Sequence, residues 1–198
     1  METTRSKASI SKAPVSKALV SKAPILMTSF RPWRSHQVSN SSDDLLAETF
    51  AQLPNEIAQE IVWLRNVPVN FQMAPIRVMG EIYRRRPRLV ICLGMAEKRD
   101  RLTLEQQAKG AQPAKGKSPV LSTPINLPAL LAGTLISDIS YDAGNYVCNH
   151  LYYSILESFN KASLQSSVLF IHVPILKADN KQFIIQDFLK ICSRLIFL

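Results

Sequence analysis

The stretch VLFIHVP, residues 168–174, decides the fold of this chain. It is apolar without a polar alternation, and so is RLVICLG, residues 88–94. Short runs of this kind are typical of strands that helices cover on both sides. The two runs therefore predict a sheet that lies between helical layers.

Strand-like and helix-like segments alternate along the chain. The predicted strands are residues 25–30, 61–69 with a break at Pro68, 89–94, 134–139 and 167–173. The predicted helices are residues 42–52, 74–86, 146–159 and 181–197. This alternation predicts an α/β fold, specifically a single-domain α/β/α sandwich, and such folds usually place their sites at the carboxyl ends of strands.

A cysteine and a histidine stand at the ends of two predicted elements. In DAGNYVCNHLYYSILE, residues 142–157, Gly144 and Asn145 are turn formers, so Cys148 falls in the first turn of the helix that follows. A helix N-terminus lowers a thiol pKa and favours the nucleophilic thiolate. His172 ends the strand over residues 167–173 and is a candidate base for that nucleophile.

Both residues also have a structural interpretation. Cys148 lies on the same helical stripe as Leu151, Tyr152 and Ile155, and the pattern alone favours a small buried hydrophobe at this position. His172 alternates with apolar residues in a buried strand, where an imidazole normally needs a hydrogen-bond partner. The pattern alone leaves both interpretations open.

Four segments resemble one enzyme family. The segments DAGNYVCNHLYYSIL and FIHVP resemble the two signature segments of the pyroglutamyl-peptidase I (pyrrolidone-carboxylate peptidase) family, cytosolic cysteine peptidases that remove an N-terminal pyroglutamate. MTSFRPW, from Met27, resembles the family's first strand and aromatic loop, and VICLGMAEKRDRLTLEQQA, from Val90, resembles its glutamate segment. The resemblance covers most of residues 25–175 and implies a divergent member with a twisted mixed, mostly parallel sheet.

The resemblance implies a catalytic role for three residues. Cys148 is the expected nucleophile, His172 its base and Glu105 the carboxylate that orients the imidazole. The reaction would pass through a thioester, with His172 first taking the thiol proton and then protonating the leaving amine. Backbone N–H groups in the first turn at Cys148 would stabilise the oxyanion.

Other carboxylates compete with Glu105 when only the residues are considered. Asp138, Asp142 and Glu97 are rivals, and a carboxylate in a polar run such as EKRDRLTLEQQ is usually solvated. His150 is a poor base, because a residue two positions after Cys148 points to another side of the helix.

The resemblance also implies a substrate pocket. Phe30 and Trp33 in TSFRPWRS are the expected substrate-binding wall against a flat pyrrolidone ring, although both could equally be ordinary core or loop aromatics. The family's glycines in this loop are replaced by larger residues, and the family's long loop after the glutamate is replaced by the shorter residues 108–128. These departures leave three functions open: a pyroglutamyl peptidase, a related cysteine hydrolase of another small N-acyl amide, and an inactive homologue with a binding or structural role.

The charge of the chain is concentrated in its first residues. Residues 1–24 form a basic Ser/Lys/Ala/Pro near-repeat that contributes +4 to the formal net charge of +9. Such a composition cannot bury enough surface to fold, so we expect a disordered tail followed by a peptidase-like domain over residues 25–198. The basic cluster YRRRPR, residues 83–88, stands where a helix is expected to end, which is an ordinary place for cations.

Composition and motifs also limit the expected cellular location, cofactors and partners. The three cysteines are an odd number at unrelated spacings, which favours a reducing, cytoplasmic location over a disulfide framework. No cofactor, metal site, nucleic-acid module or membrane span is predicted. The expected partners are peptides with an N-terminal pyroglutamate, and the sequence leaves room for a homo-oligomer.

Overall fold

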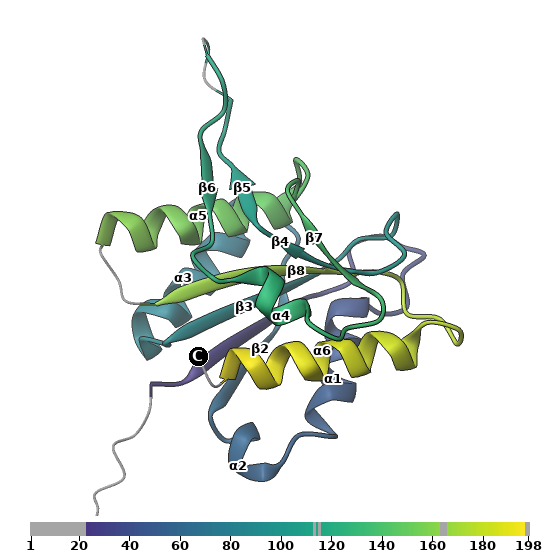
Figure 1. Ribbon diagram of the computed structural model, residues 1–198. Helices are drawn as coiled ribbons and strands as arrows, with labels where there is room; N and C mark the ends of the chain where they lie inside the picture. Colours follow the sequence, from purple (N-terminus) through teal and green to yellow (C-terminus); the bar gives the residue numbers. More distant parts are fainter. Residues whose placement is uncertain (1–22, 113, 115, 163–165, 197–198) are drawn as a thin grey trace, which may run out of the picture.

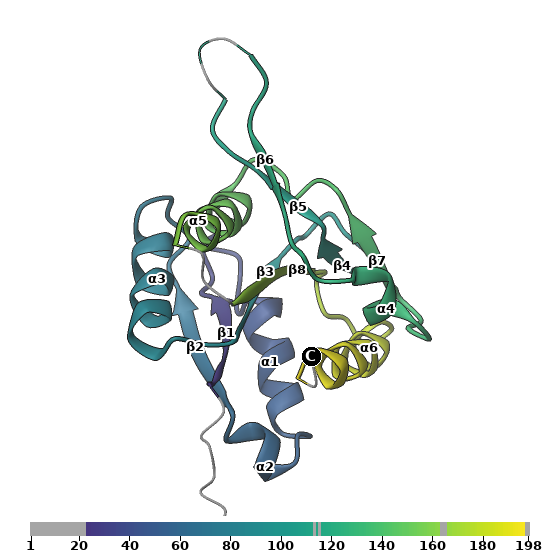
Figure 2. The ribbon, with the colours of Figure 1, turned by 60° about the vertical axis from the view of Figure 1, so that its left-hand side comes forward.

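A mixed sheet forms the middle layer of the protein. The computed structural model describes residues 23–112, 114, 116–162 and 166–196. Within them a six-stranded sheet lies between two helical layers (Figures 1 and 2). The predicted α/β/α sandwich is confirmed. The prediction of a disordered tail over residues 1–24 falls, except for its last two residues, outside the described residues.

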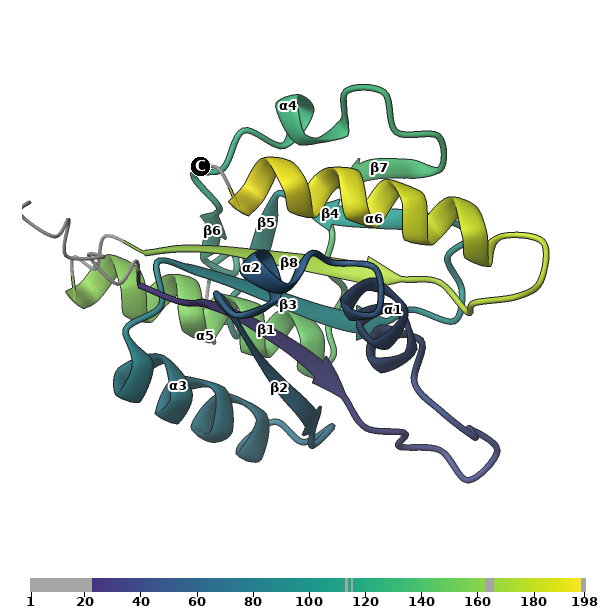
Figure 3. The same ribbon diagram turned by 90° about the horizontal axis from the view of Figure 1, so that it is seen from below.

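The sheet combines parallel and antiparallel pairs. Its strands are β1 (Ile25–Phe30), β2 (Ile61–Val67), β3 (Leu89–Met95), β4 (Leu102–Glu105), β7 (Ser137–Ser140) and β8 (Ser167–Val173). The order is β2-β1-β3-β8-β4-β7, and the view from below shows neighbouring strands turned relative to one another (Figure 3). Only the β4–β8 pair is antiparallel, so the sheet is mixed and mostly parallel, as the resemblance implies.

Helices cover both faces of this sheet. On one face, α1 (Ser41–Phe50) and α6 (Lys181–Ile196) bury apolar side chains against it. On the other face, α3 (Met73–Arg85) and α5 (Val147–Ala162) do the same (Figure 2). Each helix has an apolar stripe at helical spacing, and burying that stripe is the main force that holds the layers together.

The pleat of β3 and β8 determines which side chains reach α5. Cys92 faces the core under α3 and α5, whereas Leu93 faces the core under α1 and α6. The next position, Gly94, therefore faces α5. In β8, Phe170 lies in the α5 core, so His172 points the same way. Gly94 and His172 are direct partners in the parallel β3–β8 pair.

The predicted elements are present, β1 and β8 with the predicted ends and the others with shifted ends, and several short elements were missed. The strand predicted over residues 134–139 is β7 at 137–140, and the helix predicted over 146–159 begins at Val147 and continues to Ala162. The missed elements are α2 (Asn55–Ala58), α4 (Leu127–Leu131), the strand β4, and the strands β5 (Gln107–Lys109) and β6 (Val120–Ser122). The last two form an antiparallel hairpin that stands away from the main sheet (Figure 1).

The basic cluster at residues 83–88 has structural partners. Arg84 and Arg85 both bond to Glu81 one turn earlier in α3. Arg86 ends that helix in a left-handed conformation with φ 50°. Arg88 donates to the carbonyl oxygen of Ile196. These contacts account for the cations at this end of α3.

Cys92, Cys148 and Cys192 are free. Across the described part of the chain, no helix has the length and apolar character needed to cross a bilayer. The same residues contain no cluster of three His, Cys, Asp or Glu side chains arranged to hold a metal ion.

Candidate active site

His172 and Glu105 meet on neighbouring strands of the sheet. The distance from His172 Nδ1 to Glu105 Oε1 is 2.7 Å. Glu105 is fully buried and His172 is 6% exposed. Alternation along β4 sends Leu102 and Leu104 into the core on the α6 side and turns Glu105 toward α5. The carboxylate therefore reaches the imidazole in a site from which water is largely excluded.

Cys148 reaches the same place from the first turn of α5. Its Sγ lies against Gly94, where an added Cβ would be 2.7 Å from the sulfur. Gly94 is the sheet partner of His172, and paired strands lie about 4.8 Å apart. The structure thus gathers Cys148, His172 and Glu105, the three residues that the sequence analysis selected, on one face of the sheet.

The protonation of the His172–Glu105 pair suits a general base. Burial lowers the pKa of His172 by more than the hydrogen bond with Glu105 raises it, so the resting imidazole is neutral. Burial acts to raise the pKa of Glu105, but the hydrogen bond with His172 and the nearby positive charge of Arg99 help to bring it below its ordinary value. An ionised Glu105 then accepts from the Nδ1–H of His172, which leaves a free lone pair on Nε2.

The Cys148 thiol does not have the lowered pKa that its place in a helix predicts. Burial raises the pKa of Cys148 to about 12, and the neighbouring Cys92 and Glu105 add to the rise. A helix terminus contributes only about 0.3–1 kcal/mol, which is less than the cost of desolvating a thiolate. Cys148 therefore rests as a thiol, and a nucleophilic role for it requires a neighbouring base to accept its proton.

The start of α5 supplies backbone donors beside this thiol. The His150 N–H donates to the carbonyl oxygen of Tyr146, the residue just before α5, at 3.1 Å. Earlier N–H groups in this turn, including that of Cys148, have no preceding helical carbonyl to bind. Backbone N–H groups in such a position are able to stabilise negative charge on an oxygen beside the thiol.

The rival groups lie away from His172. Asp138, Asp142 and Glu97 each pair with a cation other than His172, at 3.8, 3.0 and 3.0 Å respectively. His150 is exposed and packs against an aromatic ring on the outer side of α5. Of the candidate carboxylates, the structure thus brings Glu105 to the imidazole.

The two predicted substrate-binding aromatics have different environments. Phe30 is 2% exposed and belongs to the core under α3 and α5. Trp33 is 42% exposed and packs on Tyr146, with ring centroids 5.2 Å apart. Tyr146 precedes Cys148 by two residues, so this exposed aromatic pair stands at the end of α5 that carries the thiol. The sequence analysis did not select Tyr146.

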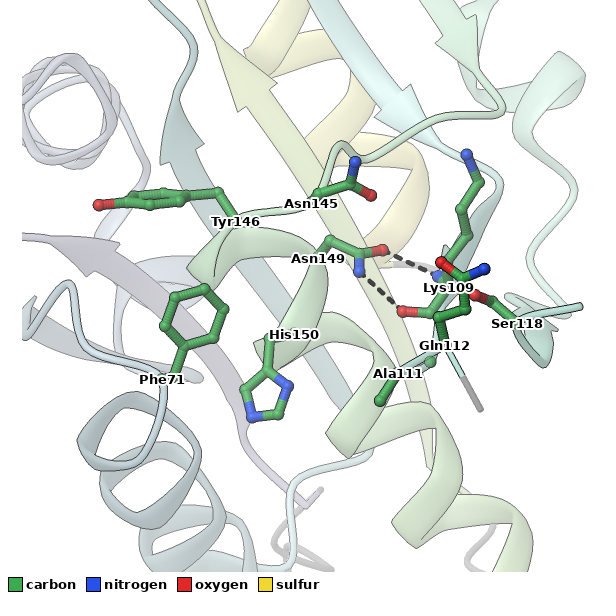
Figure 4. A pocket seen from close by; sticks show the side chains of 10 residues that line it. Phe71, Lys109, Ala111, Gln112, Ser118, Asn145, Tyr146, Asn149 and His150 are labelled. Atoms are coloured by element: carbon green, nitrogen blue, oxygen red, sulfur yellow. Dashed lines mark hydrogen bonds between the residues drawn. The ribbon is translucent and has the colours of Figure 1, made fainter. Parts of the chain in front are cut away.

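A cavity of about 420 Å³ opens beside the first turn of α5 (Figure 4). The side chains of Phe71, Tyr146 and His150 line one part of it, and Lys109 and Asn149 another. Asn149 accepts from the Lys109 N–H at 2.8 Å and donates to the Lys109 carbonyl at 2.7 Å. These two bonds hold the β5 edge against α5. Tyr146 and Asn149 flank Cys148 in sequence, but the described lining of the cavity does not include Cys148 itself.

Two further contacts of Glu105 were not predicted. Arg99 donates to Glu105 Oε1 at 2.6 Å, and the Tyr152 hydroxyl donates to the Glu105 carbonyl oxygen at 2.9 Å. In the sequence, Arg99 is one of several charges in AEKRDR and Tyr152 is part of an apolar helical stripe. The only available signal was that Arg99 lies in the same family-like segment as Glu105.

A cysteine, a histidine and a carboxylate on one face of an α/β/α sandwich form the arrangement of a cysteine-type peptidase. Comparison with known families gives a match to pyroglutamyl peptidase over residues 23–120 and 125–188. The chain belongs to the pyroglutamyl peptidase family.

Individual relatives agree with this assignment. A pyrrolidone-carboxylate peptidase of Thermosipho africanus is 31% identical, covering 77% of this chain and 82% of that protein. One from Alkaliphilus oremlandii is 27% identical, covering 84% and 88%.

Solved structures show the same fold. Pyroglutamyl peptidase I of Bacillus amyloliquefaciens superimposes with a TM-score of 0.72, covering 89% of this chain and 98% of that one at 18% identity. The pyrrolidone carboxyl peptidase of Thermococcus litoralis gives a TM-score of 0.66 over 86% and 92%, at 19% identity.

Proposed function

We propose that this protein hydrolyses the amide bond that follows an N-terminal pyroglutamyl residue. Cys148 is the nucleophile, His172 the general base and then acid, and Glu105 the orienting carboxylate. The observation that carries this proposal is the 2.7 Å bond between His172 and Glu105 on the sheet face where Gly94 leaves room for the Cys148 sulfur. Family membership supplies the pyroglutamyl group as the substrate class.

The reaction follows from the resting protonation states. As the Cys148 sulfur attacks the carbonyl carbon, its proton passes to Nε2 of His172 and negative charge develops on the carbonyl oxygen. When the tetrahedral intermediate collapses, the C–N bond breaks and His172 gives its proton to the leaving amine. The remaining thioester is hydrolysed by a water molecule whose proton His172 accepts, which releases pyroglutamate and restores the thiol.

The substrate group is a flat, uncharged lactam without an N-terminal ammonium. Exposed aromatic faces suit such a ring, and Trp33 and Tyr146 offer them beside the nucleophile. Phe30 supports this wall from the core. The cavity beside α5 has room for peptide beyond the scissile bond, with Phe71 as an apolar contact and Lys109 as a polar edge.

A second candidate is a cysteine hydrolase that acts on another small N-acyl amide. Two larger side chains stand where the family has glycines and make specific contacts: Ser29 in β1 bonds to Asp43, and Arg34 in the loop after β1 bonds to Glu97. The β5–β6 hairpin also replaces the family's longer loop. These differences favour a rebuilt acyl pocket.

A substrate panel separates the two candidates. The purified protein would be assayed with aminocoumarin amides of pyroglutamate, proline, glutamine and acetylglutamine, each with and without iodoacetamide. The first proposal expects hydrolysis of the pyroglutamyl amide alone, abolished by iodoacetamide. Faster hydrolysis of the acetylglutamine amide would favour the second candidate, and folded protein that cleaves none of the four would overturn both.

A cytoplasmic location completes the proposal. The supporting observation is that all three cysteines are free, and the mechanism needs Cys148 reduced. Fractionation of cells that express the full chain tests this location, and recovery of the protein only from an oxidising compartment would contradict it.

A further inference from the structure

The Arg99 guanidinium lies where three segments of the site meet. Arg99 belongs to the connection between β3, which carries Gly94, and β4, which carries Glu105. It donates to Glu105 Oε1 at 2.6 Å and also contacts the Thr103 hydroxyl. Its other terminal nitrogen donates to the carbonyl oxygen of Asp142 at 2.9 Å. Asp142 lies in the connection that leads from β7 into α5. The Arg99 side chain therefore links the strand of Glu105 to the loop that precedes Cys148.

Arg99 and His172 share one carboxylate oxygen. Both bond to Oε1 of Glu105, at 2.6 and 2.7 Å, whereas Oε2 is buried and has no hydrogen-bond partner among the described residues. The orientation of this carboxylate therefore depends on the two groups at Oε1. During turnover His172 changes its protonation state, and Arg99 keeps its charge throughout.

We propose that Arg99 is a positioning residue for this reaction: it fixes Glu105 in the orientation that His172 needs and ties it to the loop that leads to Cys148. The inference rests on the function proposed above. Arg99 touches the carboxylate and the loop, and nothing places it against the substrate, so its effect acts through Glu105.

The charges around His172 give this role a specific signature. Glu105 faces the imidazole from β4, Cys148 approaches from α5, and Arg99 lies behind the carboxylate. The positive charge of Arg99 contributes to the lowered pKa of His172. Removing that charge leaves an uncompensated carboxylate beside the imidazole, so the pKa of His172 should rise. An arginine that held two loops together with its charge far from the imidazole would produce no such change.

The test compares Arg99→Gln with Arg101→Gln, a control on the same connection whose arginine bonds to exposed carboxylates. With a pyroglutamyl aminocoumarin, we expect Arg99→Gln to lose about a hundredfold in kcat while KM stays within about threefold. The acidic limb of its kcat/KM profile should move to higher pH. Arg101→Gln should match the wild type in all three quantities.

A second readout does not depend on activity. The His172 imidazole would be titrated by NMR in both variants, with the signals of His36 and His150 assigned by substitution. An upward shift of the His172 titration in Arg99→Gln supports the proposal even if the pyroglutamyl amide proves not to be the substrate. An unchanged titration, or wild-type kcat in the folded variant, overturns it.

If Arg99→Gln does not fold, Arg99→Lys tests the positioning role instead. Lysine keeps the charge beside Glu105 but lacks the planar fork that also reaches Asp142. We expect a folded variant with about a tenfold lower kcat. Wild-type turnover in Arg99→Lys would show that the fork is not needed, and would overturn the positioning role.

Discussion

Gly94 and Cys148 share one space in the structure. The Cys148 sulfur lies 2.7 Å from the point where a larger residue at position 94 would place its Cβ, and a ring atom of Phe170 lies 2.9 Å from the same point. The glycine is therefore required for room, because two neighbours already occupy the site of its missing side chain.

Gly94→Ala should consequently displace the thiol from His172. A misplacement of about 1 Å at a reacting atom costs about a hundredfold in rate, so we expect a kcat/KM loss of that order. Gly80→Ala is the matched control, since nothing lies within 4 Å of a Cβ at Gly80 and alanine favours its helix. Kinetics and thermal unfolding of both variants check this, and wild-type kcat/KM in Gly94→Ala would contradict the placement of the thiol.

Glu105→Gln should slow the chemical step without weakening substrate binding. The amide keeps the shape of the carboxylate but no longer stabilises the imidazolium that forms on His172. We expect kcat to fall by roughly two to four orders of magnitude, with KM little changed. Asp138→Asn is the control, because that carboxylate is exposed and pairs with Arg101. Equal kcat values for the two variants would remove Glu105 from the mechanism.

The raised thiol pKa predicts how Cys148 reacts with iodoacetamide in the free enzyme. A thiol with a pKa of about 12 is almost entirely protonated at neutral pH, and its thiolate fraction grows with every step upward in pH. Alkylation of Cys148, followed by peptide mass spectrometry, should therefore be slower than that of a free thiol and should accelerate between about pH 6 and 9. A fast rate that is constant over this range would reveal a preformed thiolate–imidazolium pair instead.

Trp33→Ala tests the aromatic wall. Loss of the exposed ring beside Tyr146 should raise KM for the pyroglutamyl amide about tenfold, because an aromatic contact of this size contributes about 1.5 kcal/mol. Phe183→Ala is the control, since Phe183 is also half exposed but lies on α6, which covers the other face of the sheet. If both variants have the same KM, the acyl pocket lies elsewhere.

The central part of the fold could be predicted because its strands are buried on both faces. The segments of β1 and β8 are mostly apolar, and their ends were predicted to the residue. The hairpin of β5 and β6 was missed because each strand has three residues and few apolar positions, which leaves no period to recognise.

The site was predictable in its residues but not in its electrostatics. Cys148, His172 and Glu105 were chosen from motifs, and the structure brings them to one face. The thiol pKa was predicted in the wrong direction, because the sequence indicates a helix start near Cys148 but not that the sulfur packs against Gly94 of β3, where burial raises its pKa. Arg99 was missed because its contact with Glu105 depends on how the β3–β4 connection folds back.

The most direct test of the account is turnover of a pyroglutamyl aminocoumarin by Cys148→Ser, measured beside Cys92→Ala and Cys192→Ala. The latter two thiols are fully buried, and burial raises the pKa of both, so neither is expected to act as a nucleophile. With folding verified by circular dichroism, the account predicts at least about a thousandfold loss of kcat in Cys148→Ser and near wild-type kcat in the other two. Wild-type turnover by Cys148→Ser, or an equal loss in all three variants, would contradict a Cys148 nucleophile.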